Sequence, residues 1–160
     1  MFLKILLVLL VSMVPLIELR GAIPIAIAMG IDLPEWAVLL IAIIGNIIPV
    51  PFIYFFARRI LEWMAKSSWK PLRKAGKFFL KKGEKAGNKL LEKVHSGLYV
   101  ALYLFVAIPF PGTGAWTGTL AASILNLDFK KSMVAIISGV VTAGVIMLLI
   151  SLGLFRVIFG

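Results

Sequence analysis

The stretch between Lys93 and Asp128 constrains this chain more than any other feature. Its 34 residues carry no formally charged side chain, and Pro109-Phe110-Pro111-Gly112-Thr113-Gly114 interrupts them in the middle. A helix that spans a bilayer needs about 20 apolar residues, and a cluster of prolines and glycines breaks its hydrogen-bond ladder. We therefore expect a helix that enters the membrane, turns at the cluster and leaves again.

The composition is typical of a protein dissolved in lipid. Hydrophobic residues make up 61% of the 160 residues, charged residues make up 15%, and the mean hydropathy is +1.05. A soluble domain of this size cannot bury so much apolar surface. The chain has no cysteine and one histidine, His95, which excludes disulfides, thiolate sites and multi-histidine metal sites. The sequence predicts an integral membrane protein without a metal or a cofactor.

Basic residues concentrate in one segment. Of the 17 Lys and Arg residues, 12 lie between Arg58 and Lys93 beside three acids, which gives that segment +9 of the net charge of +10. Short basic loops remain in the cytoplasm. The uncharged runs Trp36–Ala57 and Ser132–Phe155 are then expected to cross the cell membrane inward and outward, so that both termini lie outside.

Two further apolar segments are divided into short arms. The arms are Ile5–Ile17 and Gly21–Ile31 around Glu18-Leu19-Arg20, and Leu98–Ile108 and Ala115–Leu127 around the Pro/Gly cluster. Each arm would be roughly 16 to 20 Å long as a helix, which is too short for a hydrocarbon core of about 30 Å. Each pair of arms is therefore predicted to form a re-entrant helical hairpin.

The two halves of the chain resemble each other weakly. A shift of 94 residues aligns Pro15 with Pro109, Ile31-Asp32-Leu33 with Leu125-Asn126-Leu127, and Gly45 with Gly139. Each half would contain a hairpin followed by one transmembrane helix, and a single crossing per half would place the second copy upside down. The expected fold is an all-α membrane protein of two inverted repeats, 1–57 and 94–160, joined by the basic segment 58–93. Inverted repeats with broken helices are typical of secondary transporters.

The basic segment has a helical pattern of its own. Apolar residues from Leu72 to Val94 recur every three or four positions, and Trp63 and Trp69 precede them. We expect a cytoplasmic amphipathic helix that binds anionic lipid headgroups. A solvated loop that only fixes topology is the alternative, and nucleic acid is not an expected partner because the membrane already supplies an anionic surface. The expected lipid-binding residues are Lys74, Lys77, Lys81, Lys85 and Lys89.

Two charged residues are predicted at the tip of the first hairpin. Ionisable groups at membrane depth are costly and usually mark a substrate or ion pathway. Glu18 is a candidate proton carrier because desolvation favours a neutral carboxyl group, and the guanidinium of Arg20 suits an anionic or phosphate-bearing headgroup. In the alternative, the hairpin is shallow and the two charges only pair with each other.

The second tip offers backbone geometry and hydroxyl groups. Prolines break the incoming arm, glycines permit tight turns, and the amino end of the next arm exposes N–H groups that can bind an anion. Asn46 is the one strong polar group inside the first full span, where a structural hydrogen bond and a substrate contact are equally plausible. The special positions of the second tip are Pro109, Pro111, Gly112, Thr113, Gly114 and Thr117.

Three strings carry a resemblance to a known family: Glu18-Leu19-Arg20-Gly21-Ala22-Ile23-Pro24, Gly45-Asn46-Ile47-Ile48-Pro49-Val50-Pro51, and Pro109 to Gly118 with Trp116. They resemble the putative small multidrug export family, which is distantly similar to DedA-type membrane proteins. The resemblance implies two re-entrant hairpins and movement of lipids or undecaprenyl phosphate linked to the proton-motive force. DedA-type proteins place essential arginines around the second hairpin, whereas here the arginine near a tip is Arg20 in the first.

The sequence thus predicts a secondary transporter, coupled to protons, for an amphipathic, lipid-phosphate-like or small drug-like molecule. It predicts no enzyme, because no catalytic triad or metal cluster is visible. The alternative is a membrane organiser that binds anionic lipids or a partner protein without transport. A homodimer is plausible for so small a bundle. The expected pathway residues are Glu18, Arg20, Gly21, Pro24, Asn46, Pro109, Pro111, Gly112, Thr113, Gly114, Trp116 and Thr117.

Overall fold

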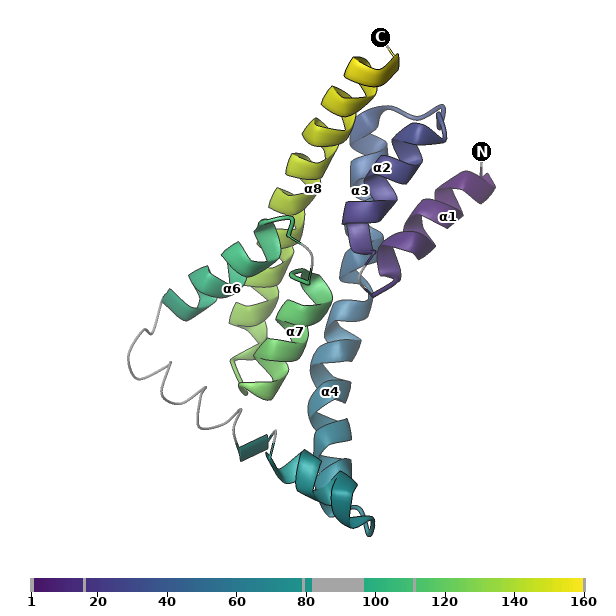
Figure 1. Cartoon of the computed structure of the whole chain (residues 1–160). Coiled ribbons are helices and arrows are strands. Elements are labelled where there is room, and N and C mark those ends of the chain that lie inside the picture. Colours follow the sequence, from purple (N-terminus) through teal and green to yellow (C-terminus); the bar gives the residue numbers. More distant parts are fainter. Residues whose placement is uncertain (1, 16, 79, 82–96, 111, 160) are drawn as a thin grey trace.

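The computed structural model describes residues 2–15, 17–78, 80–81, 97–110 and 112–159, and these residues form helices without a strand (Figure 1). Residues 70–78 are also helical. The predicted all-α class is confirmed. The seven helices of ten residues or more within the described ranges are α1 (Phe2–Met13), α2 (Glu18–Ala28), α3 (Glu35–Ile47), α4 (Pro49–Lys66), α6 (Gly97–Ala107), α7 (Ala115–Ile124) and α8 (Phe129–Phe159).

Two long apolar helical rods are candidates for crossing a membrane. Helices α3 and α4 follow one another over the 32 residues Glu35–Lys66, and α8 contains 31 residues. Their lengths of about 45 Å exceed a hydrocarbon core of about 30 Å. The two rods run in opposite directions (Figure 1). The predicted spans Trp36–Ala57 and Ser132–Phe155 therefore lie inside continuous or nearly continuous helices.

Pairs of short helices precede each long rod. Helices α1 and α2 contain 12 and 11 residues, and α6 and α7 contain 11 and 10 residues. Each helix is about 15 to 18 Å long, as expected for the arms of a hairpin. In Figure 1 the chain reverses direction between the members of each pair, and the two reversals lie close together at the centre of the molecule.

The first reversal comes earlier in the chain than the sequence suggested. Glu18 and Arg20 were expected in the turn itself, but α2 begins at Glu18, so both residues belong to its first turn. The cause is Pro15, which lacks an N–H group and disfavours helical backbone at the residue before it. Helix α1 ends at Met13, and Glu18 adopts a positive φ of 50° where the new helix begins.

Each hairpin packs on both long rods. Helix α1 contacts α3, and α6 contacts α8; α2 also contacts α8, and α7 contacts α4. Helices in lipid are not driven together by the hydrophobic effect, so they associate through close packing. Small residues at the contacts allow the helices to approach closely. The buried core lies between the rods and the hairpins and includes Ala22, Ile23, Ala26, Ala42, Ile136 and Val140.

Gly45 and Gly139 make equivalent contacts in the two halves. A Cβ on Gly45 would lie 2.5 Å from the carbonyl oxygen of Leu9, and a Cβ on Gly139 would lie 2.9 Å from that of Tyr103. Leu9 and Tyr103 are separated by 94 residues, as are the two glycines. Each long rod therefore needs a glycine where the first helix of its hairpin crosses it.

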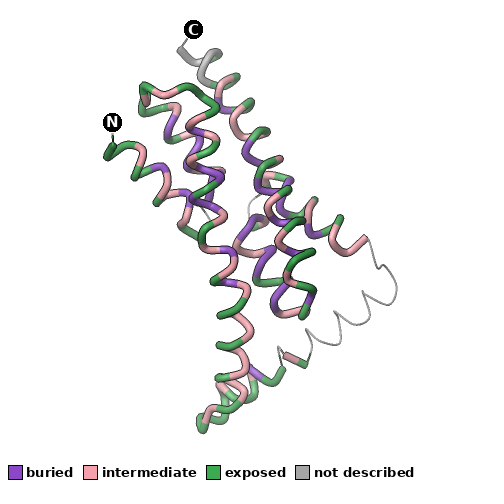
Figure 2. Tube along the Cα trace, turned by 180° about the vertical axis from the view of Figure 1, so that it is seen from behind, coloured by how far each residue is buried: buried purple, intermediate pink, exposed green. Residues whose placement is uncertain are grey.

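Large apolar side chains cover the outer surface of the rods. Figure 2 shows exposed positions along α4 and α8, where a soluble protein of this size would carry polar residues. Such a surface is typical of helices that face lipid chains. The most exposed apolar residues of these two helices include Phe52, Phe55, Phe56, Val134, Leu149 and Val157.

The described part of the basic segment folds back on the end of α4. Gly76 of the helical stretch 70–78 is buried, and a Cβ there would lie 2.8 Å from the carbonyl oxygen of Leu61. Lys74, Lys77 and Lys81 are exposed, as the amphipathic pattern predicted. The lysines at positions 85 and 89, also predicted to bind lipid, lie outside the described residues.

Candidate functional site

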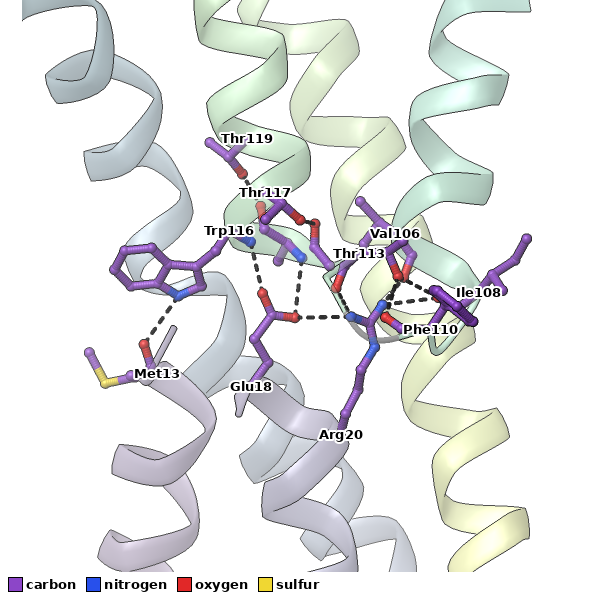
Figure 3. Close-up of polar contacts among 12 residues, drawn as sticks. Met13, Glu18, Arg20, Val106, Ile108, Phe110, Thr113, Trp116, Thr117 and Thr119 are labelled. Atoms are coloured by element: carbon purple, nitrogen blue, oxygen red, sulfur yellow. Dashed lines mark hydrogen bonds and ion pairs between the residues drawn. The ribbon is translucent and has the colours of Figure 1, made fainter. Parts of the chain in front are cut away.

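Glu18 caps the amino end of α7. Its side chain is only about 5% exposed, and its carboxylate accepts hydrogen bonds from the backbone N–H groups of Trp116 (2.9 Å) and Ala115 (3.3 Å), as Figure 3 shows. The first N–H groups of a helix have no partner within the helix, and the helix dipole makes this end partly positive. A buried carboxylate from the first hairpin therefore satisfies the helix end of the second.

Arg20 caps the opposite helix end. Its guanidinium donates to the carbonyl oxygens of Val106 (3.0 Å) and Ile108 (3.2 Å) at the end of α6, and to that of Thr113 in the turn before α7 (Figure 3). The carboxyl end of a helix is partly negative, which favours a cation there. Arg20 Nη1 also lies 3.8 Å from Glu18 Oε2. Two side chains in the first turn of α2 thus bind the two helix ends that meet at the second turn: the end of α6 and the start of α7.

The second turn is shaped to receive these two groups. Gly114 has a φ of 147°, and a Cβ on it would overlap the Glu18 carboxylate and lie 2.7 Å from Arg20 Nη1. The hydroxyl of Thr113 lies within hydrogen-bond distance of the carbonyl oxygens of Ile108 (2.9 Å) and Phe110 (2.8 Å), which share its one hydrogen. These contacts satisfy carbonyls that the broken helix leaves free.

Trp116 makes the reciprocal contact. Its indole Nε1 donates to the carbonyl oxygen of Met13, the last residue of α1, over 3.2 Å (Figure 3). Each hairpin therefore supplies side chains that satisfy the backbone of the other. This matters because backbone groups that cannot reach water must find partners inside the protein.

A cavity of about 490 Å³ lies at the junction of the two turns. Besides the residues expected from the sequence, Pro15, Ile17, Phe110, Leu120 and Met147 line it. The cavity thus combines an ion pair with an apolar wall. Eight of the expected pathway residues line it: Glu18, Arg20, Gly21, Pro109, Gly112, Thr113, Trp116 and Thr117.

The remaining expected residues are placed differently. Gly114 contacts the ion pair, but Pro24 and Asn46 are absent from the cavity wall. Asn46 is 1% exposed, and its Oδ1 has no hydrogen-bond partner among the residues with described positions. Pro24 lies inside α2. Pro111 falls outside the described residues.

Sequence reasoning missed several contributors to this site. Met147 of α8 and Leu120 of α7 line the cavity, and no polar or conformational signal distinguishes them from the other apolar residues of their helices. It also did not foresee that carbonyl oxygens would be the partners of Arg20. Within the described ranges there is no group of three or more His, Cys, Asp or Glu residues that could hold a metal ion.

The comparison with known proteins gives one clear result. No curated protein and no solved structure matched the chain. A family model described as a putative small multi-drug export protein matches residues 18–146, which begin at Glu18 and include Gly45, Gly139 and the second turn. This description denotes export rather than catalysis, and the two long apolar helices agree with a location in a membrane. The matched region covers well over half of the sequence, so the chain belongs to the putative small multi-drug export protein family.

Proposed function

We propose that the protein is a secondary transporter that couples substrate movement to protons through Glu18. The observation that carries this proposal is the cavity of about 490 Å³ at which a buried carboxylate and a guanidinium from one hairpin bind both helix ends of the other. Buried ionisable groups inside an apolar bundle are expensive and by default indicate a pathway for ions or substrate.

The transporter would be built from two inverted repeats, 1–57 and 94–160, whose hairpins are re-entrant. The equivalent crossings at Gly45 and Gly139 support this. So do the contacts that the second helix of each hairpin makes with the long rod of the other half, α2 with α8 and α7 with α4. The opposite directions of the two rods in Figure 1 agree with it. In such transporters the site lies where the broken helices of the two repeats meet.

Protonation of Glu18 would weaken the junction between the hairpins. Hydrogen bonds to a charged carboxylate are roughly twice as strong as those to a neutral group. A neutral Glu18 would bind the N–H groups of Ala115 and Trp116 less tightly and would no longer attract Arg20. The equilibrium would shift toward a second arrangement of the hairpins, because a proton favours whichever state binds it better.

The cavity fits an amphipathic or small drug-like molecule with an anionic group such as a phosphate. Its volume lies in the usual range of about 300 to 1,000 Å³ for small-molecule sites. Arg20 Nε is buried and has no hydrogen-bond partner among the described residues, so one donor remains for a substrate. Ile17 and Phe110 supply the apolar wall. A hydrogen bond from this donor to an oxyanion would be charge-assisted.

The alternative, a membrane organiser without transport, has one observation in its favour. Lys74, Lys77 and Lys81 are exposed in the basic segment and can bind anionic lipids. An organiser, however, has no use for a cavity whose wall combines polar groups from two hairpins. We therefore favour the transporter, with the basic segment in the cytoplasm, both termini outside and a homodimer as its expected assembly.

Flux measurements in proteoliposomes test this proposal. Purified protein is reconstituted, a pH gradient is imposed, and the uptake of candidate lipid phosphates and of cationic drugs is compared with uptake by protein-free vesicles. We expect uptake of at least one candidate to exceed the protein-free rate and to depend on the gradient. Uptake that exceeds this rate but ignores the gradient would refute proton coupling, whereas no uptake of any candidate would favour the organiser.

A further inference from the structure

A second hollow lies between α6 and α8, which lie side by side in Figure 1. Its volume is about 590 Å³, and it shares no lining residue with the cavity at the hairpin junction. Tyr99 and Tyr103 of α6 form one wall, and Lys130, Lys131 and Val134 of α8 form much of the other. We call this hollow the α6–α8 groove.

One end of the α6–α8 groove carries a net positive charge, from Lys130 and Lys131 less the carboxylate of Asp128. Lys130 and Lys131 are exposed in the first turn of α8, and neither ammonium group forms an ion pair with an acid of the described ranges. The carboxylate of Asp128 accepts the backbone N–H of Lys131 at 2.9 Å. The first turn of a helix is the positive end of its dipole, so two lysines there add to the positive charge instead of compensating it.

The groove becomes apolar away from the lysines. Lys130, Val134 and Ser138 are spaced by four residues, so they lie on one face of α8 over about 12 Å. Val134 is 67% exposed and Val100 on the opposite wall is 55% exposed, so little of the described part of the chain covers either side chain. The hydroxyl of Tyr103 already has a partner, Thr142 Oγ1 at 3.1 Å, which leaves its ring as a contact surface.

Lys131 is directed across the groove. Its Nζ lies 5.8 Å from the centre of the Tyr99 ring, within the range of a cation–π interaction. Tyr99 is in turn fixed, because its hydroxyl oxygen accepts the backbone N–H of Asp128 over 3.3 Å. Lys131, one of the two lysines at the positive end of the groove, is therefore held against the opposite wall.

We propose that the α6–α8 groove binds one anionic phospholipid per chain. The phosphate would contact Lys130 and Lys131, and an acyl chain would lie along Val134 and Val100. The charge of the groove complements such a headgroup, and its apolar walls complement the acyl chain. Basic pockets between membrane helices are known to bind lipids of this class. The site is independent of the proposed transport pathway.

Native mass spectrometry of the purified full-length protein tests this proposal. The protein is placed in detergent micelles with equal amounts of phosphatidylglycerol and phosphatidylcholine, and the lipid retained per chain is counted. We expect one saturable phosphatidylglycerol, with a preference on the order of tenfold over phosphatidylcholine. The double variant Lys130→Gln, Lys131→Gln should lose the preference. The double variant Lys66→Gln, Lys70→Gln removes the same charge at two exposed lysines outside the groove and should keep the preference.

A variant that keeps the charge separates the groove from general electrostatic attraction. Ser138→Trp should fill the apolar part of the groove and reduce the retained phosphatidylglycerol without changing the net charge. Equal loss of preference in both lysine variants would overturn the proposal, because bulk charge would explain it. Retention of the preference in Lys130→Gln, Lys131→Gln would also overturn it. So would displacement of the lipid by inorganic phosphate at the same concentration, because the apolar walls would then contribute nothing.

Discussion

The Glu18 carboxylate occupies the space that a side chain on Gly114 would need. A Cβ built on Gly114 overlaps Glu18 Oε2, and the φ of this glycine, 147°, is one that residues with a side chain rarely adopt. The two residues come from different hairpins and lie 96 positions apart. The junction between the hairpins therefore depends on the absence of a side chain at this position.

Gly114→Ala is expected to disrupt the junction. The methyl group would displace the carboxylate and force the backbone into a strained conformation, which costs about 1 to 3 kcal/mol. We expect a lower thermal midpoint in detergent and loss of transport in proteoliposomes. Gly153→Ala is the matched control, because a Cβ on Gly153 of α8 meets nothing within 4 Å. If both variants are as stable and active as the wild type, the junction has been misinterpreted.

Gly45→Ala and Gly139→Ala are expected to destabilise the protein by similar amounts. Each added methyl group would push the first helix of a hairpin away from its long rod, at a cost of about 1 to 3 kcal/mol for overpacking. The measurement is the thermal midpoint of each variant beside that of Gly153→Ala. A large effect at one glycine and none at the other would argue against equivalent crossings in two repeats.

Arg20→Lys is expected to impair transport although the charge is retained. The guanidinium donates to three carbonyl oxygens and lies near Glu18, whereas a lysine is a point charge without the planar fork. Loss of one such charge-assisted bond costs about 1.5 to 3 kcal/mol, which corresponds to a tenfold or greater loss of transport. Arg59→Lys, on the exposed side of α4, serves as the control. Equal transport by both variants would show that charge alone suffices at Arg20.

The orientation in the membrane can be read from labelling of single cysteines, because the chain has none of its own. Asp32 and Lys131 are exposed near the starts of the two long rods. A cysteine at Asp32 is expected to react with an impermeant maleimide only from outside. Cysteines at Lys77 and Lys131 are expected to react only from the cytoplasm. External labelling at Lys77 would reverse the proposed orientation.

Much of the helix layout could be predicted because lipid imposes simple rules. The uncharged runs predicted the long rods, and the breaks at Pro15 and Pro109 predicted the short helices on either side of each break. The predicted start of α2 at Gly21 is wrong, because the charged residues Glu18 and Arg20 were expected to form the turn. Glu18 and Arg20 lie in the first turn of the helix, where their side chains reach across to the other hairpin.

The composition of the site was only partly predictable. The sequence could mark Glu18, Arg20 and the glycines as unusual, since each is costly or special in a membrane helix. It could not indicate that Arg20 would donate to carbonyl oxygens of the second hairpin, because those contacts join residues 86 to 93 positions apart. Asn46 is as polar as the site residues but does not line the cavity.

The most direct test of the account is proton-coupled uptake by Glu18→Gln. The amide keeps the shape of the side chain but cannot carry a proton, so uptake driven by an imposed pH gradient should be abolished in protein that still folds. The thermal midpoint should fall, because the amide binds the N–H groups of α7 less tightly and no longer pairs with Arg20. Glu62→Gln removes an equal charge from the partly exposed pair with Arg58 and should transport normally. If Glu18→Gln instead takes up substrate at the wild-type rate under the gradient, Glu18 is no proton carrier and serves only as the partner of Arg20 and of α7.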